Sequence, residues 1–309
     1  MSGAVVFGDM LSNESFGAVR LSCLDLVELP RLMAITTGAP HVKVALIDGP
    51  VATDHPDLAA AAIQDVTLTT PGRCQTSSSF ACMHGTVAAG ILCARRGSRA
   101  PAICPNCTLL LRPIFSETAR DGKPFIPTAA PEELAVAIRE CVDAGARVLN
   151  LSLALGQVRP IEERAVDDAL GYASQRGSLV VAASGNQGSI GSSAITRHPW
   201  VIPVVAYDQR RKPLGLSNLA GSIGRGGIGA PGDNVVSLTA SGKSMSAGGT
   251  SVAAPFVTGA IALLASEFPK AAPSEIRDAV MQPSFRRTTV VPPLLDAWAA
   301  YRFLQHRQR

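Results

Sequence analysis

The sequence is poor in charged and aromatic residues for its length. Of its 309 residues, 17% are Asp, Glu, Lys or Arg and 5% are aromatic, whereas 47% are hydrophobic. This composition is typical of α/β proteins, in which a parallel sheet is covered by helices on both faces. No repeat or linker divides the chain, so we predict a single domain. Within it, we expect residues 1–40 to be an N-terminal extension packed on the domain and residues 293–309 to be a C-terminal helix with a basic tail.

Neither a secretory signal nor a membrane span is indicated by the sequence. Residues 1–11 have no basic start and no apolar core of the length that a signal needs. The longest apolar stretch, residues 252–265, is interrupted by Thr258 and is too short to cross a bilayer. We therefore expect a cytoplasmic protein without a membrane partner.

The sequence also lacks a nucleic-acid-binding patch. Its net charge is only +4, and the arginines near the C-terminus are not interleaved with aromatic residues. We interpret these arginines as the solvated face of a C-terminal helix. We expect no nucleic-acid partner, and we expect a monomer.

Cysteines are few and odd in number. There are seven, so at least one thiol has no partner within the chain. Cys104 and Cys107 form a CxxC motif without a second half, which argues against zinc and gives only a weak indication of redox chemistry. Cys74 and Cys82 flank a serine-rich loop and could form a disulfide, although free thiols are the default expectation in a cytoplasmic protein.

Signals for a cofactor or a metal are missing as well. Gly224, Gly226 and Gly229 have the spacing of a dinucleotide-binding motif, but Ala230-Pro231-Gly232 follow them where a helix would be required. The turn at Arg95-Arg96-Gly97 lacks the Asn and Asp residues that would give calcium its oxygen ligands. We predict neither a cofactor nor a bound metal.

Apolar runs alternate with helical patterns along most of the chain. Strands are predicted at residues 42–47, 108–113, 147–153, 179–183 and 200–206, and helices at 24–37, 84–92, 131–144, 161–176, 274–281 and 294–304. Residues 215–243 are glycine-rich and are expected to be irregular or β. The alternation predicts an α/β fold with a three-layer, doubly wound, mostly parallel sheet flanked by helices.

Gly248-Gly249-Thr250-Ser251 indicates a tight turn that places Ser251 on the first turn of a buried helix. The glycines permit backbone angles that are closed to other residues. Pro255 is expected so early in this helix that its missing N–H costs little. Ser251 would be exposed at the positive end of the helix dipole, beside backbone N–H groups that could hold an oxyanion.

Four polar residues are expected at one rim of the sheet. Asp48 ends a strand, Asn186 follows another, and His84 and Ser251 each begin a helix. Parallel sheets bind ligands at the carboxyl ends of their strands. A serine that attacks a carbonyl needs an imidazole to take its proton, a carboxylate to orient that imidazole and a donor for the oxyanion. Considered singly, each residue also has a purely structural interpretation, as a turn residue or as the start of a helix.

Four motifs resemble those of the subtilisin family of serine peptidases over residues 42–264. They are Val44-Ala45-Leu46-Ile47-Asp48 with His55-Pro56-Asp57-Leu58, then His84-Gly85-Thr86-Val87-Ala88-Ala89-Gly90, Ala182-Ala183-Ser184-Gly185-Asn186 and Gly249-Thr250-Ser251-Val252-Ala253-Ala254-Pro255. Their order along the chain, with the acid first and the serine last, is also that of subtilisin.

This resemblance implies a role for each residue of the set. Asp48 would orient His84, His84 would be the general base and acid, Ser251 the nucleophile, and Asn186 a donor to the oxyanion. It further implies that a peptide substrate adds a strand to the edge of the site. The residues expected to bind this substrate are Leu151, Ser152, Leu153 and Ala154 on one wall, Ser184 and Gly185 on the other, and Ile126 and Thr128 further from the cut.

The turn after Asp48 departs from the common family pattern. Gly49-Pro50 follow it, where many members have Ser or Thr and then Gly. With this turn, and with no room for a long inhibitory prodomain before residue 42, the sequence resembles the proteases that mature cyanobactin-type ribosomal peptides. It implies hydrolysis of a precursor peptide, since residues 116–128 are too short for a large cap over the site.

Three other functions are compatible with the sequence. The chain could be a catalytically silent peptide-binding homologue that keeps the groove, a general intracellular protease, or a cysteine-dependent enzyme. The complete set of Asp48, His84, Asn186 and Ser251 favours a serine endopeptidase over these alternatives.

Overall fold

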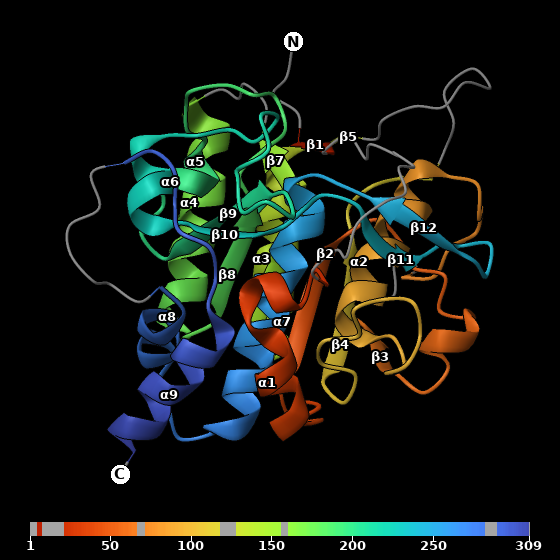
Figure 1. Ribbon diagram of the computed structural model, residues 1–309. Coiled ribbons are helices and arrows are strands. Elements are labelled where there is room, and N and C mark those ends of the chain that lie inside the picture. The colour runs from red at the N-terminus through yellow and green to blue at the C-terminus, as the bar shows by residue number, and fades with distance from the viewer. Residues whose placement is uncertain are drawn as a thin grey trace.

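The computed structural model describes residues 5–7, 22–66, 72–117, 128–155, 160–281 and 289–308. A seven-stranded sheet in the order β10-β9-β8-β6-β2-β4-β3 forms its centre, and all neighbouring strands are parallel (Figure 1). The strands are β2 (Lys43–Asp48), β3 (Ala62–Asp65), β4 (Thr108–Pro113), β6 (Val148–Leu151), β8 (Leu179–Ala183), β9 (Val201–Tyr207) and β10 (Ile228–Pro231). The predicted doubly wound parallel sheet is thus confirmed.

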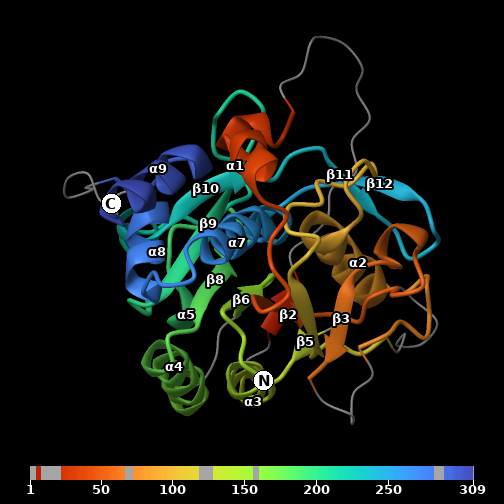
Figure 2. The same cartoon turned by 90° about the horizontal axis from the view of Figure 1, so that it is seen from below.

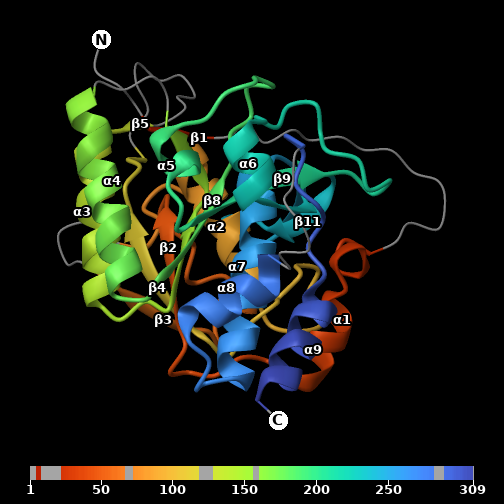
Figure 3. The same ribbon diagram turned by 90° about the vertical axis from the view of Figure 1, so that its left-hand side faces the viewer.

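Helices cover both faces of this sheet. They are α1 (Leu29–Ile35), α2 (Phe80–Cys93), α3 (Pro131–Asp143), α4 (Pro160–Gln175), α5 (Ala194–Arg197), α6 (Gly221–Gly226), α7 (Thr250–Glu267), α8 (Pro273–Met281) and α9 (Ala297–Arg307), with 3-10 turns η1 (Asp25–Val27) and η2 (Pro56–Leu58). Figures 2 and 3 show α3 and α4 on one side of the sheet and α1, α7, α8 and α9 on the other.

The period of two along β2 explains why both faces are apolar. Val44 and Leu46 belong to the larger core cluster, which includes α2 and α7, whereas Ala45 and Ile47 belong to the cluster under α3 and α4. Successive side chains of a strand point to opposite faces, so a strand covered on both sides needs an uninterrupted apolar run. Strands β4, β6, β8 and β9 are likewise buried at every residue.

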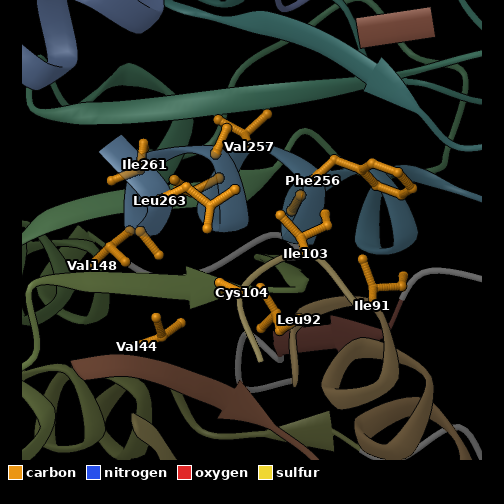
Figure 4. Close-up of a cluster of buried hydrophobic side chains, with 14 of the residues drawn as sticks. Val44, Ile91, Leu92, Ile103, Cys104, Val148, Phe256, Val257, Ile261 and Leu263 are labelled. Carbon is orange, nitrogen blue, oxygen red and sulfur yellow. The ribbon is translucent and has the colours of Figure 1, made fainter. Parts of the chain in front are cut away.

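Helix α7 lies in the middle of the larger core. Phe256 lies on the side of Ile91 in α2 and Ile103 in the segment that follows it, and Val257, Ile261 and Leu263 belong to the same cluster (Figure 4). The helix has 18 residues and a mean hydropathy of 1.3, which would suffice to cross a membrane, but 89% of it is buried within the fold. The apolar stretch considered too short to span a bilayer is thus part of a longer helix, and this helix is the core of the domain.

Several predicted boundaries differ from the structure. The predicted strand at residues 147–153 divides at Ser152 into β6 and a separate strand, β7 (Leu153–Leu155). Helix α2 begins at Phe80, four residues earlier than predicted, because Ser79 caps it by accepting a hydrogen bond from the Cys82 N–H. The glycine-rich residues 215–243 contain α6, β10 and β11 (Val235–Leu238), which pairs with β12 (Ser244–Ala247).

A small separate sheet lies at the edge of the domain. It has the order β5-β1-β7, where β1 is Val5–Phe7 and β5 is Thr128–Ala129, and both pairings are antiparallel. The sequence did not predict β1 or β5, because strands of two or three residues carry no periodic pattern.

Cys74 and Cys82 form a disulfide. The default expectation of free thiols is therefore wrong for this pair. The other five cysteines are free, namely Cys23, Cys93, Cys104, Cys107 and Cys141. Burial raises the pKa of Cys23 to about 11 and also raises the pKa of Cys141, so neither thiol is activated as a nucleophile.

Candidate active site

Asp48 and His84 are hydrogen-bonded at the carboxyl end of β2. His84 Nδ1 lies 2.7 Å from Asp48 Oδ1, and both residues are buried. The same carboxylate oxygen accepts a hydrogen bond of 2.6 Å from the Gly49 N–H, which fixes the orientation of the acid. A carboxylate at Nδ1 holds the proton on that nitrogen and leaves Nε2 as the basic atom of the ring. His84 lies in the second turn of α2 rather than at its start.

Two glycines allow β2 and α2 to come this close. A Cβ at Gly49 would fall on the carbonyl of Ala81, in the first turn of α2, and a Cβ at Gly85 would fall on the carbonyl of Gly49. Any side chain at position 49 would therefore push the strand end away from the helix, and with it Asp48 from His84. This contact accounts for a glycine at the position where many family members have serine or threonine.

Ser251 is the second residue of α7, directly after the turn at Gly249. Gly249 has φ of 115°, in the region that favours glycine. Ser251 is only 2% exposed, so the expectation that it is exposed is wrong. Its Oγ has no hydrogen-bond partner among the described residues. The residue lies at the N-terminal end of a long buried helix, where the helix dipole is positive.

Pro255 lies deeper in α7 than predicted. It is the sixth residue of the helix, where its N–H would ordinarily have bonded the Ser251 carbonyl. Ser152 takes over this role, because its Oγ donates a hydrogen bond of 3.0 Å to that carbonyl. Ser152 Oγ in turn accepts a hydrogen bond of 2.6 Å from Asn150 Nδ2. Thr258 Oγ1 donates a hydrogen bond of 2.8 Å to Asn150 Oδ1. A buried polar chain thus connects β6 to the backbone of Ser251.

Thr250 holds the side chain of Asn186 in one orientation. The Thr250 N–H and Oγ1 donate to Asn186 Oδ1 at 2.9 and 2.8 Å. Thr250 Oγ1 also accepts from the Gly185 N–H at 3.2 Å. Asn186 Nδ2 is buried and has no hydrogen-bond partner among the described residues. The amide oxygen is therefore occupied, whereas the buried amide N–H groups have no acceptor among the described residues.

The residues predicted to bind substrate lie in several places. Leu151 and Leu153 are buried in the core, so their side chains do not line a groove. Ser184 is buried, with an Oγ that lacks a partner among the described residues, and Gly185 has φ of 103°. Ala154 and Thr128 lie on strands β7 and β5, whereas Ile126 lies outside the described residues.

An open cleft adjoins this end of the sheet. Its lining includes Pro50 beside Asp48, Ile114 and Phe115 after β4, and the charged residues Arg73 and Glu117. Cys74, Cys82 and Glu117 are the one group of potential metal ligands within the described residues, but the two cysteines are joined to each other. These three residues therefore do not fit a metal ion.

The sequence did not predict the roles of Thr250, Asn150 and Thr258. Thr250 could have been noticed, since it lies beside the serine in the same motif, whereas Asn150 and Thr258 sit in segments that look like ordinary strand and helix. Taken together, these segments supply a buried serine hydroxyl, a carboxylate–imidazole pair and a side-chain amide donor. This set of groups can carry out acyl transfer.

Comparison with known proteins agrees with this geometry. The subtilase family (Peptidase_S8) matches residues 40–296, which is more than half of the chain. The chain is 31% identical over 239 residues to the thermophilic serine proteinase of Bacillus sp. (strain AK1), with 75% of this chain and 54% of that protein aligned. It is 29% identical over 264 residues to subtilisin DY of Bacillus licheniformis, with 82% of this chain and 88% of subtilisin DY aligned.

Solved structures of maturation proteases are similar in fold. A serine-to-alanine mutant of the protease domain of PatA superposes with a TM-score of 0.77 at 28% identity, covering 87% of this chain and 97% of that one. The structure of the prenylagaramide maturation protease PagA superposes with a TM-score of 0.75 at 26% identity, and the alignment covers 90% of this chain and 98% of PagA. The resemblance to such proteases in the sequence is thereby confirmed. The chain belongs to the subtilase family of serine endopeptidases.

Proposed function

We propose that this chain cleaves a precursor peptide through an acyl-enzyme formed on Ser251. The observations that carry the proposal are the short hydrogen bond between Asp48 and His84 and the presence of a buried serine hydroxyl and a buried amide donor that both lack a partner among the described residues. Buried polar atoms without partners are uncommon in folded proteins and point to a site that a ligand completes.

Each residue has one task in the reaction. Ser251 Oγ attacks the carbonyl carbon of the scissile bond while His84 Nε2 accepts its proton. Asn186 Nδ2 and backbone N–H groups at the start of α7 donate to the oxyanion. His84 then gives the proton to the leaving amine, and the acyl group stays on Ser251. Water hydrolyses this ester with His84 again as the base, and Asp48 stays ionised throughout and stabilises the imidazolium.

The choice of a precursor peptide as substrate rests on the similarity to PatA and PagA. PagA and PatA are described as maturation proteases, and the chain covers 98% of each of these two structures. The Asp48-Gly49-Pro50 turn, required here by the close packing of α2, is a further feature shared with this group by sequence resemblance. Substrate would enter as an extended strand along β7, with Ser184 and Gly185 on the opposite wall.

The proposal is tested with a quenched-fluorescence peptide library and four proteins: the parent, Ser251→Ala, His84→Ala and Asn186→Ala. We expect the parent to cut selected peptides, the first two variants to be inactive, and Asn186→Ala to retain a small fraction of the turnover. Folding of each variant is checked by circular dichroism. Cleavage by Ser251→Ala would overturn the assignment, and tight binding without cleavage by the parent would favour a silent peptide-binding homologue.

A further inference from the structure

Asn218 binds the backbone on both sides of Asn186. Its Oδ1 accepts a hydrogen bond of 3.1 Å from the Gln187 N–H, and its own backbone N–H donates a hydrogen bond of 2.9 Å to the Gly185 carbonyl. These two partners belong to the peptide groups that flank the Cα atom of Asn186. A single residue, distant in the sequence, thus holds both peptide groups next to the amide that we assign to the oxyanion.

The side chain of Asn218 also binds the rest of the loop at residues 185–189. Ser189 donates to Asn218 Oδ1 from its N–H at 3.1 Å and from its Oγ at 3.0 Å. Asn218 Nδ2 donates a hydrogen bond of 2.6 Å to Gln187 Oε1. Both ends of the amide are therefore in use, which defines its orientation. Gly185 makes the contact possible, because a Cβ at this position would fall on Asn218 Nδ2.

The segment that carries Asn218 is anchored to the central sheet. The preceding residue, Ser217, is buried, and its Oγ accepts a hydrogen bond of 3.2 Å from the Ala206 N–H in β9. Gln187 and Ser189, in contrast, are exposed and lie outside the helices and strands. Hydrogen bonds to the anchored segment, rather than burial, therefore determine the shape of the loop.

We propose that Asn218 is a positioning residue that places the Asn186 amide for contact with the oxyanion. A donor acts on an oxyanion only at a distance of about 2.7–3.1 Å, and the asparagine side chain is short, so a shift of its backbone moves Nδ2 with it. Thr250 holds Asn186 Oδ1 from the side of α7, so the residue is fixed by two supports. This inference rests on the proposed function, because it takes Asn186 to be the oxyanion donor.

Asn218→Ala and its matched control Ser189→Ala test this role by steady-state kinetics on a peptide from the library. The first removes the acceptor of the Gln187 N–H, whereas the second removes only a hydroxyl that donates to the same oxygen. Water can replace the lost bonds of these exposed residues, so both proteins are expected to fold, which circular dichroism and thermal melting verify.

We expect Asn218→Ala to lower kcat about three- to tenfold with KM nearly unchanged, as when about a tenth to a third of the molecules keep the competent loop geometry. Ser189→Ala should keep nearly the kcat of the parent. Equal kcat values of the two variants, or a higher KM of Asn218→Ala at unaltered kcat, would overturn the inference.

The same substitution in an Asn186→Ala background separates positioning from a general structural role. Asn218→Ala should cause no further loss of kcat there, because the amide that it positions is already gone. A loss of equal size in both backgrounds would overturn the inference, since Asn218 would then act on another part of the site.

Residue-resolved hydrogen exchange tests the hydrogen bonds independently of activity. In the parent, the amides of Gln187 and Ser189 should be protected although both residues are exposed, and Asn218→Ala should accelerate their exchange without affecting β8. Unprotected exchange of both amides in the parent would overturn the inference without any variant. If the parent neither cleaves peptides nor reacts with a fluorophosphonate, the proposed function fails; an active parent that loses no kcat with Asn218→Ala contradicts the inference alone.

Discussion

Thr250→Val should weaken catalysis by loosening Asn186 while leaving the fold and the nucleophile in place. Valine has nearly the shape of threonine but lacks the hydroxyl that donates 2.8 Å to Asn186 Oδ1. The backbone N–H of residue 250 still holds that oxygen at 2.9 Å, so one of two anchors is lost. The Asn186 amide would then spend part of its time turned away from the oxyanion.

The size of the effect follows from one neutral hydrogen bond, which contributes about 1 kcal/mol. A loss of this size lowers kcat about fivefold and leaves KM nearly unchanged, because Asn186 Nδ2 acts on charge that develops only in the transition state. Removing the amide itself, in Asn186→Ala, should cost about 10²- to 10³-fold; this range is the loss measured for the equivalent donor of subtilisin, a relative of this chain.

The hydroxyl of Thr250 also serves the backbone. It accepts from the buried Gly185 N–H at 3.2 Å, and leaving that group without a partner should lower the free energy of unfolding by about 1 to 3 kcal/mol. Thr250→Ser is the matched control, since it keeps the hydroxyl and should preserve both kcat and stability.

Steady-state kinetics on a peptide from the library, together with thermal melting, measures these effects. The double variant Thr250→Val/Asn186→Ala should be no slower than Asn186→Ala alone, because the hydroxyl acts through the amide. A change in KM with kcat unaltered, or full additivity of the two substitutions, would refute the reasoning.

Three further predictions concern packing, two of them around the site and one at the amino end of β9. Gly49→Ala should lower both activity and melting temperature, because its Cβ would fall on the Ala81 carbonyl. Gly171→Ala is the control: nothing lies within 4 Å of its new methyl group, so it should be neutral or slightly stabilising. Equal melting temperatures of the two variants would contradict this prediction. Ser152→Ala should lower the free energy of unfolding by about 1 to 3 kcal/mol, because the buried Ser251 carbonyl loses its donor. Adding Pro255→Ala to that variant should restore part of the loss, because alanine supplies a helical N–H. Denaturant titration of the single and the double variant checks this. Burial lowers the pKa of His198, and its Nδ1 accepts from the Trp200 N–H, so the folded protein favours the neutral ring. The stabilisation is present above the ordinary histidine pKa of about 6.5 and is lost as the pH falls through it toward the lower folded-state value. Unfolding of His198→Asn should depend less on pH between about 5 and 7 than unfolding of the parent, and identical pH profiles would rule this out.

Much of the site could be predicted because its residues stand at the ends of regular elements. Asp48 directly follows the apolar residues 44–47 of a strand, and Ser251 lies in the first turn of a long apolar helix, so the topology of a parallel sheet favours placing them at one rim. Such positions are encoded locally, in hydrophobic runs and in the residues that terminate them.

Contacts that depend on distant packing could not be predicted. The hydrogen bond from Ser152 to Ser251 arises because Pro255 leaves a carbonyl open, and only the relative placement of β6 and α7 makes this evident. Similarly, the sequence shows Gly49 only as a departure from the family pattern, whereas the structure shows that the first turn of α2 packs against it and leaves no room for a side chain. The short strand β1 carries no periodic signal, because its pairing is determined by two edges far away in the sequence.

The central claim is that Ser251 is a nucleophile activated by His84 and Asp48. Its most direct test is fluorophosphonate labelling followed by mass mapping of the modified peptide in the parent, His84→Ala and Asp48→Asn. We predict one adduct on Ser251 of the parent and labelling slowed by orders of magnitude in both variants, since each loses the activation of the hydroxyl. An adduct on another residue, or equal labelling of Ser251 in all three proteins, would contradict it.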